Sequence, residues 1–266
     1  MKSVIARTWI AAFLLLPAFV SGQPAIAPPQ LGFVEDGARA LRPVYGLAGN
    51  FILGPSVAAK IVSQAFSGSL GLLKTNSSLA AFDSQGKLLA SMDVAPGPAF
   101  FAFSPSGTTA LAYITSSNSL VEWRGGAFAP LLIHYEERSA DAVLALAFPN
   151  PFEVSLLIQR RDTIWELSFP LGSVGTASQK ALIGVHAPVL ALSSGDLVYS
   201  PAGGIVVRRT DASEVRISAS LPASFSLRQM NQDWVQLTDL NGRARFAIHA
   251  KTGREGIYQL PSSNPE

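Results

Sequence analysis

Residues 98–115 read PAFFAFSPSGTTALAYIT, and this stretch decides the fold class. An unbroken apolar run, Pro98–Phe103, leads into the cluster Ser104–Gly107, and a second apolar run, Ala110–Thr115, follows. Serine, proline and glycine favour tight turns, whereas aliphatic and aromatic runs of this length favour strands. The stretch therefore predicts two antiparallel strands joined by a short turn, with the first strand buried on both faces.

The same pattern of an apolar run followed by a turn cluster recurs along the chain. Phe103, Phe148 and Leu192 end three such runs and lie 45 and 44 residues apart. A fourth run is Ala223–Leu227, and an earlier, less regular copy is Ala58–Phe66, which ends 37 residues before Phe103. Each copy is followed by three further short candidate strands. Because four strands per repeat of this length is the spacing of a propeller blade, we predict an all-β propeller of about five four-stranded blades.

The stretch Phe103–Tyr113, FSPSGTTALAY, resembles the F-S-P-D-G-x-x-x-A-Y signature of bacterial WD-like propeller repeats of the Tol–Pal type. Ser106 stands where the signature has aspartate, and the other copies keep only the apolar run and the turn. The resemblance implies a propeller fold and a setting outside the cytoplasm. It carries over no binding partner.

The first 22 residues have the pattern of a signal peptide. Lys2 and Arg7 precede the apolar run Trp9–Val20, and small residues at Ser21 and Gly22 suit cleavage after Gly22. The run is shorter than the about 20 residues that span a bilayer. We therefore expect a periplasmic or extracellular protein with no membrane span after cleavage.

The rest of the chain divides into three parts. The proline-rich residues 23–43 predict an extended linker, residues 44–261 the propeller domain, and residues 262–266 a C-terminal tail. The apolar segment Val44–Leu53 has no blade of its own, so we expect it to add a strand to the last blade beside Gly256–Leu260. A plug across the channel mouth is the alternative.

Charge and cysteine content exclude several classes of function. Removing the signal leaves 18 basic and 18 acidic residues, so the mature chain lacks the basic surplus typical of nucleic-acid binding. The chain has no cysteine, which excludes thiol catalysis, zinc–thiolate sites and iron–sulfur clusters.

The sequence offers no catalytic motif. The three histidines, His134, His186 and His249, belong to different repeats, and the predicted inner strands carry no acidic residue, so we expect a packed, apolar channel. No catalytic residue, metal site or cofactor is assigned. The first hypothesis is therefore a non-catalytic module that binds a protein or envelope component of unknown identity. The alternative is a carbohydrate-active hydrolase or lyase that uses the channel.

Two charged segments are the candidate binding face. They fall on connections that a propeller places at the same end of its ring, and they are Glu136, Glu137, Arg138 and Arg160, Arg161, Asp162. Solvated turns with local ion pairs are the alternative explanation for both segments. The sequence leaves the oligomeric state open.

Overall fold

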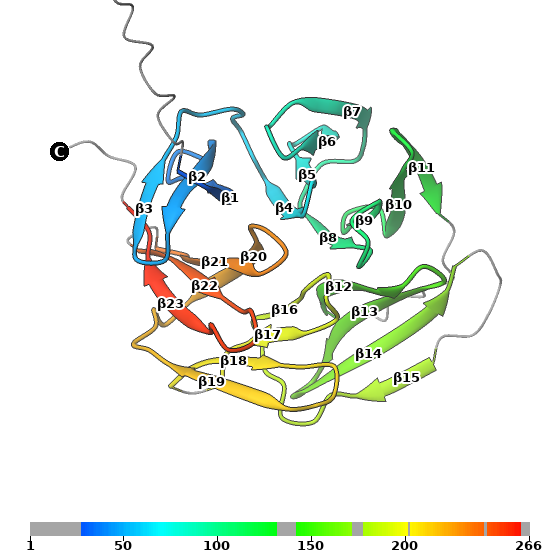
Figure 1. Cartoon of the computed structure of the whole chain (residues 1–266). Helices are drawn as coiled ribbons and strands as arrows, with labels where there is room; N and C mark the ends of the chain where they lie inside the picture. The colour runs from blue at the N-terminus through cyan, green and yellow to red at the C-terminus, as the bar shows by residue number, and fades with distance from the viewer. Residues whose placement is uncertain (1–27, 132–141, 172–177, 202, 242–243, 262–266) are drawn as a thin grey trace, which may run out of the picture.

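The computed structural model describes residues 28–131, 142–171, 178–201, 203–241 and 244–261. Every regular element in these ranges is a strand, and the strands form six antiparallel sheets arranged around a ring (Figure 1). The predicted all-β propeller is confirmed. The prediction gave about five four-stranded blades; the described residues hold five such blades and, ahead of them in the chain, a sixth sheet of three strands.

The blades are numbered here in chain order. Blade 1 consists of β1 (Gln30–Glu35), β2 (Leu41–Leu47) and β3 (Asn50–Leu53). The strands of blades 2 and 3 are β4 (Ser63–Ser67), β5 (Leu70–Lys74), β6 (Ser78–Asp83), β7 (Leu88–Asp93), β8 (Ala99–Phe103), β9 (Thr109–Ile114), β10 (Ser119–Arg124) and β11 (Ala127–Leu131). Those of blade 4 are β12 (Ala142–Asn150), β13 (Glu153–Arg160), β14 (Thr163–Pro170) and β15 (Ser178–Ala181). Those of blades 5 and 6 are β16 (Val189–Ala191), β17 (Leu197–Tyr199), β18 (Gly204–Arg208), β19 (Glu214–Ser218), β20 (Phe225–Gln229), β21 (Trp234–Asp239), β22 (Arg245–His249) and β23 (Gly256–Gln259).

The turn in blade 3 forms where the sequence predicts it. The Gly107 N–H donates to the Ser104 carbonyl at 2.8 Å, and Gly107 has a φ of 68°, a region that favours glycine. The Ser104 hydroxyl accepts the Thr109 N–H at 3.1 Å and so closes the turn. The inner strand β8 and its neighbour β9 are almost wholly buried, as expected for strands that lie between two blades.

Within the described ranges, blade 1 has no innermost strand. In blades 2 to 6 the first strand lies nearest the axis, and these five inner strands contact one another in a closed ring in which β20 touches β4 directly. In blade 1, by contrast, β1 contacts β4 and β21, the second strand of blade 6. Leu31 lies beside the turn that follows β20, and Glu35 lies beside the middle of β21. The strand β1 therefore runs in the same direction as β21, which is the direction of the second strand of every other blade. Blade 1 therefore corresponds to the second, third and fourth strands of the other blades.

The N-terminal part of the propeller differs from the sequence prediction. Residues 30–43, expected to be a linker, form β1 and the beginning of β2, because Phe33, Val34 and Leu41 are apolar and pack into the core. The expected leader at residues 1–22 and the tail at 262–266 lie outside the described residues.

The predicted closure by strand pairing is wrong. Val44–Leu53 pairs with β1 in a sheet of its own, and β23 pairs with β22. The two chain ends are joined instead by side-chain packing. The Phe51 ring meets those of Trp234 and Tyr258 edge to face, with centroids 5.9 and 6.1 Å apart. Val44 and Phe51 are thus buried against the face of blade 6 rather than along its edge, whereas Leu47 and Ile52 remain exposed.

Candidate functional site

The predicted binding residues are only partly described. Glu136, Glu137 and Arg138 lie outside the described residues. Arg160, Arg161 and Asp162 form the turn between β13 and β14, as expected, and Arg161 has a φ of 53°. Arg160 Nη1 donates to Gln179 Oε1 at 2.9 Å on the outer strand of the same blade. The turn follows β13, the second strand of blade 4. Since second strands run antiparallel to inner strands, it lies at the end of the ring where the inner strands begin.

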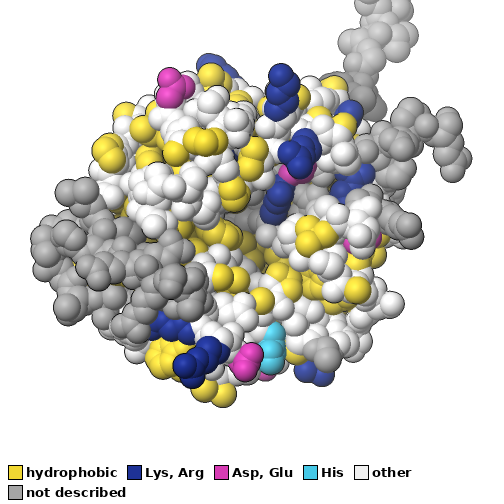
Figure 2. All heavy atoms as spheres, turned by 180° about the vertical axis from the view of Figure 1, so that it is seen from behind, with side chains coloured by type: hydrophobic (Ala, Val, Ile, Leu, Met, Phe, Trp, Pro, Cys, Tyr) yellow, Lys and Arg dark blue, Asp and Glu magenta, His cyan; other side chains and the backbone are white. Residues whose placement is uncertain are grey.

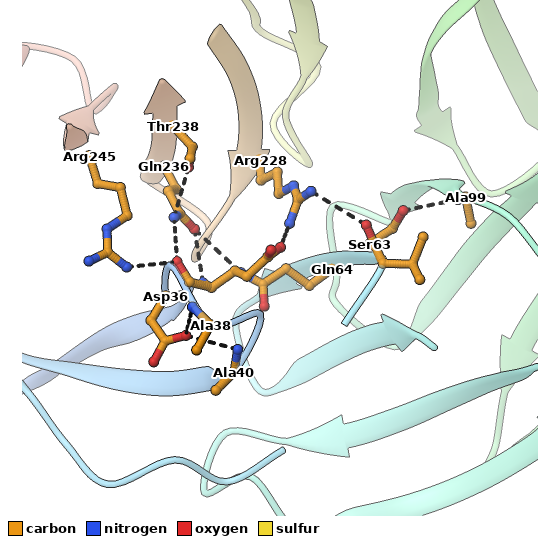
Figure 3. Close-up of polar contacts among 12 residues, drawn as sticks. Asp36, Ala38, Ala40, Ser63, Gln64, Ala99, Arg228, Gln236, Thr238 and Arg245 are labelled. Atoms are coloured by element: carbon orange, nitrogen blue, oxygen red, sulfur yellow. Dashed lines mark hydrogen bonds and ion pairs between the residues drawn. The ribbon is translucent and has the colours of Figure 1, made fainter. Parts of the chain in front are cut away.

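A polar cluster lies where blade 1 lacks its inner strand (Figure 3). Without that strand, the inner edge of β1 needs other partners for its buried backbone groups. The Gln236 side chain supplies two of them: Nε2 donates to the Glu35 carbonyl at 2.9 Å, and Oε1 accepts the Glu35 N–H at 3.2 Å. Asn231 Nδ2 likewise donates to the Leu31 carbonyl at 2.9 Å. Side-chain amides from blade 6 therefore replace a strand.

Ion pairs fill the rest of this cluster. Arg228, on β20, forms an ion pair with Glu35 and donates to the Val62 carbonyl at 3.4 Å. Asp36 accepts from Arg42 Nε at 2.6 Å, and Arg245 Nη1 donates to the Glu35 carbonyl at 3.3 Å. Figure 3 shows Asp36 of blade 1, Gln64 of blade 2, and Arg228 and Arg245 of blade 6 converging on this place.

The carboxylate of Asp36 is held in its ionised form. Burial by itself would raise its pKa, but hydrogen bonds from Arg42 and from the Ala40 and Ala38 amides, together with the charge of Arg42, lower the pKa below its usual value. Burial lowers the pKa of Arg228, whose guanidinium nevertheless stays charged at neutral pH. A glycosidase needs one carboxyl group with a raised pKa as general acid, and Asp36 is shifted in the opposite direction.

Sequence reasoning missed Glu35 and Asp36 because it placed them in a linker. It also missed Gln64, which interrupts the less regular run Ala58–Phe66, and Arg228, which directly follows the run Ala223–Leu227. The apolar pair Phe33-Val34, followed by Glu35 and then by Asp36-Gly37, was a usable signal for a short strand and a turn.

The channel is not fully packed, contrary to expectation. A cavity of about 230 Å³ lies on the axis and is lined by the inner strands of blades 2 to 6. Its walls are largely apolar, but Gln64 and Arg228 border it. At the far end of the inner strands Ser67 and Ser193 share a hydrogen bond of 2.8 Å, and Gln229 Nε2 donates to Ser193 at 3.3 Å. Figure 2 shows a central hollow with largely hydrophobic walls and basic side chains gathered beside it.

A larger groove of about 910 Å³ lies at the end of the ring where the inner strands finish. Leu70, Leu89, Trp123 and Phe148 supply apolar walls from blades 2, 3 and 4, and the turn Ser104–Thr109 borders it. Trp123 Nε1 is buried and has no hydrogen-bond partner among the described residues. The groove therefore presents apolar surface from three blades.

Among the described residues, no group of three or more histidine, aspartate or glutamate side chains could hold a metal ion. In the same residues, no helix is long and apolar enough to cross a membrane.

Comparison with known proteins shows likeness of fold alone. No family model and no curated protein matches the chain. It is similar to a chain in the nidogen–laminin complex, with 11% identity and a TM-score of 0.54 over 88% of this chain and 99% of that one. TolB from Acinetobacter baumannii has 13% identity and a TM-score of 0.48, over 87% of this chain and 66% of TolB. The Cps50 (Swd1) propeller domain from Myceliophteria thermophila has 9% identity and a TM-score of 0.44, over 79% and 68%. The chain is a β-propeller, and at such identities the likeness says nothing about its function.

Proposed function

We propose that this chain is a non-catalytic interaction module of the periplasm or cell exterior that holds a segment of a partner in the 910 Å³ groove. The groove is the observation that carries the proposal. It has the size of a ligand site, three blades contribute apolar walls to it, and Leu89 is 44% exposed within it.

The signal-like first 22 residues support the location. The ion-paired carboxylates of the polar cluster support a non-catalytic role over the carbohydrate-active alternative, since Asp36 is held ionised by Arg42. The cluster joins blades 1 and 6 and so has a structural role of its own.

The test is capture of envelope proteins by the mature chain. Leu89→Glu places a charge in the groove at an exposed position, and Leu240→Glu makes the same change at a 64% exposed position elsewhere. We expect Leu89→Glu to abolish capture of a partner that Leu240→Glu retains.

Arg161→Asn tests the charged turn of blade 4, and asparagine tolerates the positive φ there. If Arg161→Asn alone loses capture, the partner binds at the opposite end of the ring from the groove.

Catalysis is tested on a panel of aryl glycosides. The proposal expects no hydrolysis above background. Turnover by the wild type that disappears in Glu35→Gln would overturn it in favour of a glycosidase.

A further inference from the structure

We propose that the axial cavity is a binding site for a small carboxylate that carries a hydroxyl group next to the carboxylate and a short apolar tail. This site is separate from the groove. The proposal rests on two polar groups that the described residues leave incompletely used and on the volume and lining of the cavity that both groups border.

The first group is the side-chain oxygen of Gln64. Gln64 is 3% exposed and borders the cavity, and its Oε1 has no hydrogen-bond partner among the described residues. Its Nε2 is directed to Gln236 Oε1 at 3.4 Å, and Gln236 is in turn committed to Glu35, which fixes the assignment of the two amide atoms. A buried acceptor without a donor is destabilising, so a ligand that brings an O–H group is favoured at this point.

The second group is the guanidinium of Arg228, which also borders the cavity. A guanidinium has five N–H donors, and the partners of Arg228 in the described part of the chain are Glu35 and the Val62 carbonyl. The planar arrangement of its remaining donors matches a carboxylate. A ligand ammonium group would be repelled by this cation, which favours a neutral hydroxyl as the donor for Gln64.

The other residues that line the cavity determine the size of the ligand and require its tail to be apolar. Phe101, Leu146 and Leu190 are among the apolar walls. The volume of about 230 Å³ equals that of about eight water molecules in the liquid. The Ser67–Ser193–Gln229 hydrogen bonds close the space at the end of the inner strands, so a ligand enters from the end where those strands begin.

The probe is 2-hydroxyisocaproate, and its matched control is isocaproate, which has the same carbon skeleton without the hydroxyl. Isothermal titration calorimetry on the mature protein should show binding of the hydroxy acid and about three- to tenfold weaker binding of isocaproate, because one neutral hydrogen bond is lost. Binding of both should fall when Arg228 is replaced by glutamine.

Gln64→Leu isolates the acceptor. It should weaken 2-hydroxyisocaproate to the level of isocaproate and leave isocaproate unchanged. Gln179→Leu makes the same change on the exposed outer strand β15 and should leave both affinities unchanged.

Because Arg228→Gln leaves the Glu35 carboxylate without its ion-pair partner, the fold of this variant is checked by thermal unfolding. Leu190→Phe provides a second test, since it fills the cavity and should weaken binding of both acids. Absence of binding by the wild type, which means that the cavity holds water only, or equal affinity of Gln64→Leu and wild type would overturn the proposal.

Discussion

The junction between blades 3 and 4 and the junction between blades 6 and 1 solve the same packing problem in different ways. At the first, buried side chains from both blades form one continuous, mainly aliphatic cluster that includes Leu111, Leu146 and Ile158. At the second, a smaller cluster around Phe51 and Trp234 is supplemented by the polar contacts of Glu35. The difference follows from strand number. Where a blade has all four strands, backbone pairing is complete and apolar packing suffices; where the inner strand is missing, polar side chains must pair the exposed edge.

The largest effect should come from removing blade 1. Deletion of residues 1–53 exposes the faces of blades 6 and 2 that Phe33, Val44 and Phe51 cover. We expect loss of cooperative unfolding, because the ring then has two open sides. Urea denaturation followed by circular dichroism and tryptophan fluorescence measures this. Deletion of residues 1–27 is the control, and an unchanged midpoint after the longer deletion would show that blade 1 is dispensable.

Truncating one aromatic residue at each junction compares the stability and the cooperativity of the two junctions. Trp234→Ala and Phe169→Ala each remove a large buried ring, and each should cost about 3–5 kcal/mol of unfolding free energy. The denaturant m value should fall in Trp234→Ala, because blade 1 detaches before the rest of the ring, and stay constant in Phe169→Ala. Equal m values would mean that the two junctions are equally cooperative.

A smaller effect is expected from the polar cluster. Gln236→Leu keeps the side-chain volume but leaves the buried Glu35 N–H without an acceptor, at a cost of roughly 1–3 kcal/mol. Ser155→Ala, which removes a buried hydrogen bond to Ser168 inside blade 4, is the matched control and should cost about 0.5–1.5 kcal/mol. The comparison fails if the two variants lose the same stability in chemical denaturation.

The smallest effect concerns His249, which stacks on Trp234 with ring centroids 4.2 Å apart. Burial, with the charges of Arg254 and Lys251, lowers its pKa below 6.5, and Asp233 and Glu255 oppose this.

The unfolded chain therefore binds a proton at His249 more readily than the folded protein does. The stability contributed by neutral His249 is complete above about pH 6.5 and is lost as the pH falls below it. The melting temperature should drop between pH 7.5 and pH 5.5, and it should drop less in His249→Phe, which keeps an aromatic ring against Trp234. An identical pH profile in the two proteins would assign the drop to other groups.

The sequence by itself determined the fold class and most of the blades. Runs such as Pro98–Phe103, each followed by a turn cluster at a near-constant interval, fix inner strands and turns because strand burial and turn formation are local properties. The same reasoning placed Arg160–Asp162 in a turn correctly.

The closure of the ring and the contents of its axis depend on contacts between distant parts of the chain. In the part of the chain that the structure describes, blade 1 has three strands rather than four, so it carried no periodic signal and Glu35 and Asp36 were assigned to a linker. The contacts of Gln236 with Glu35 and of Arg228 with Val62 join residues 201 and 166 positions apart in the chain. No local pattern encodes such pairs, because they exist only once the last blade has returned to the first.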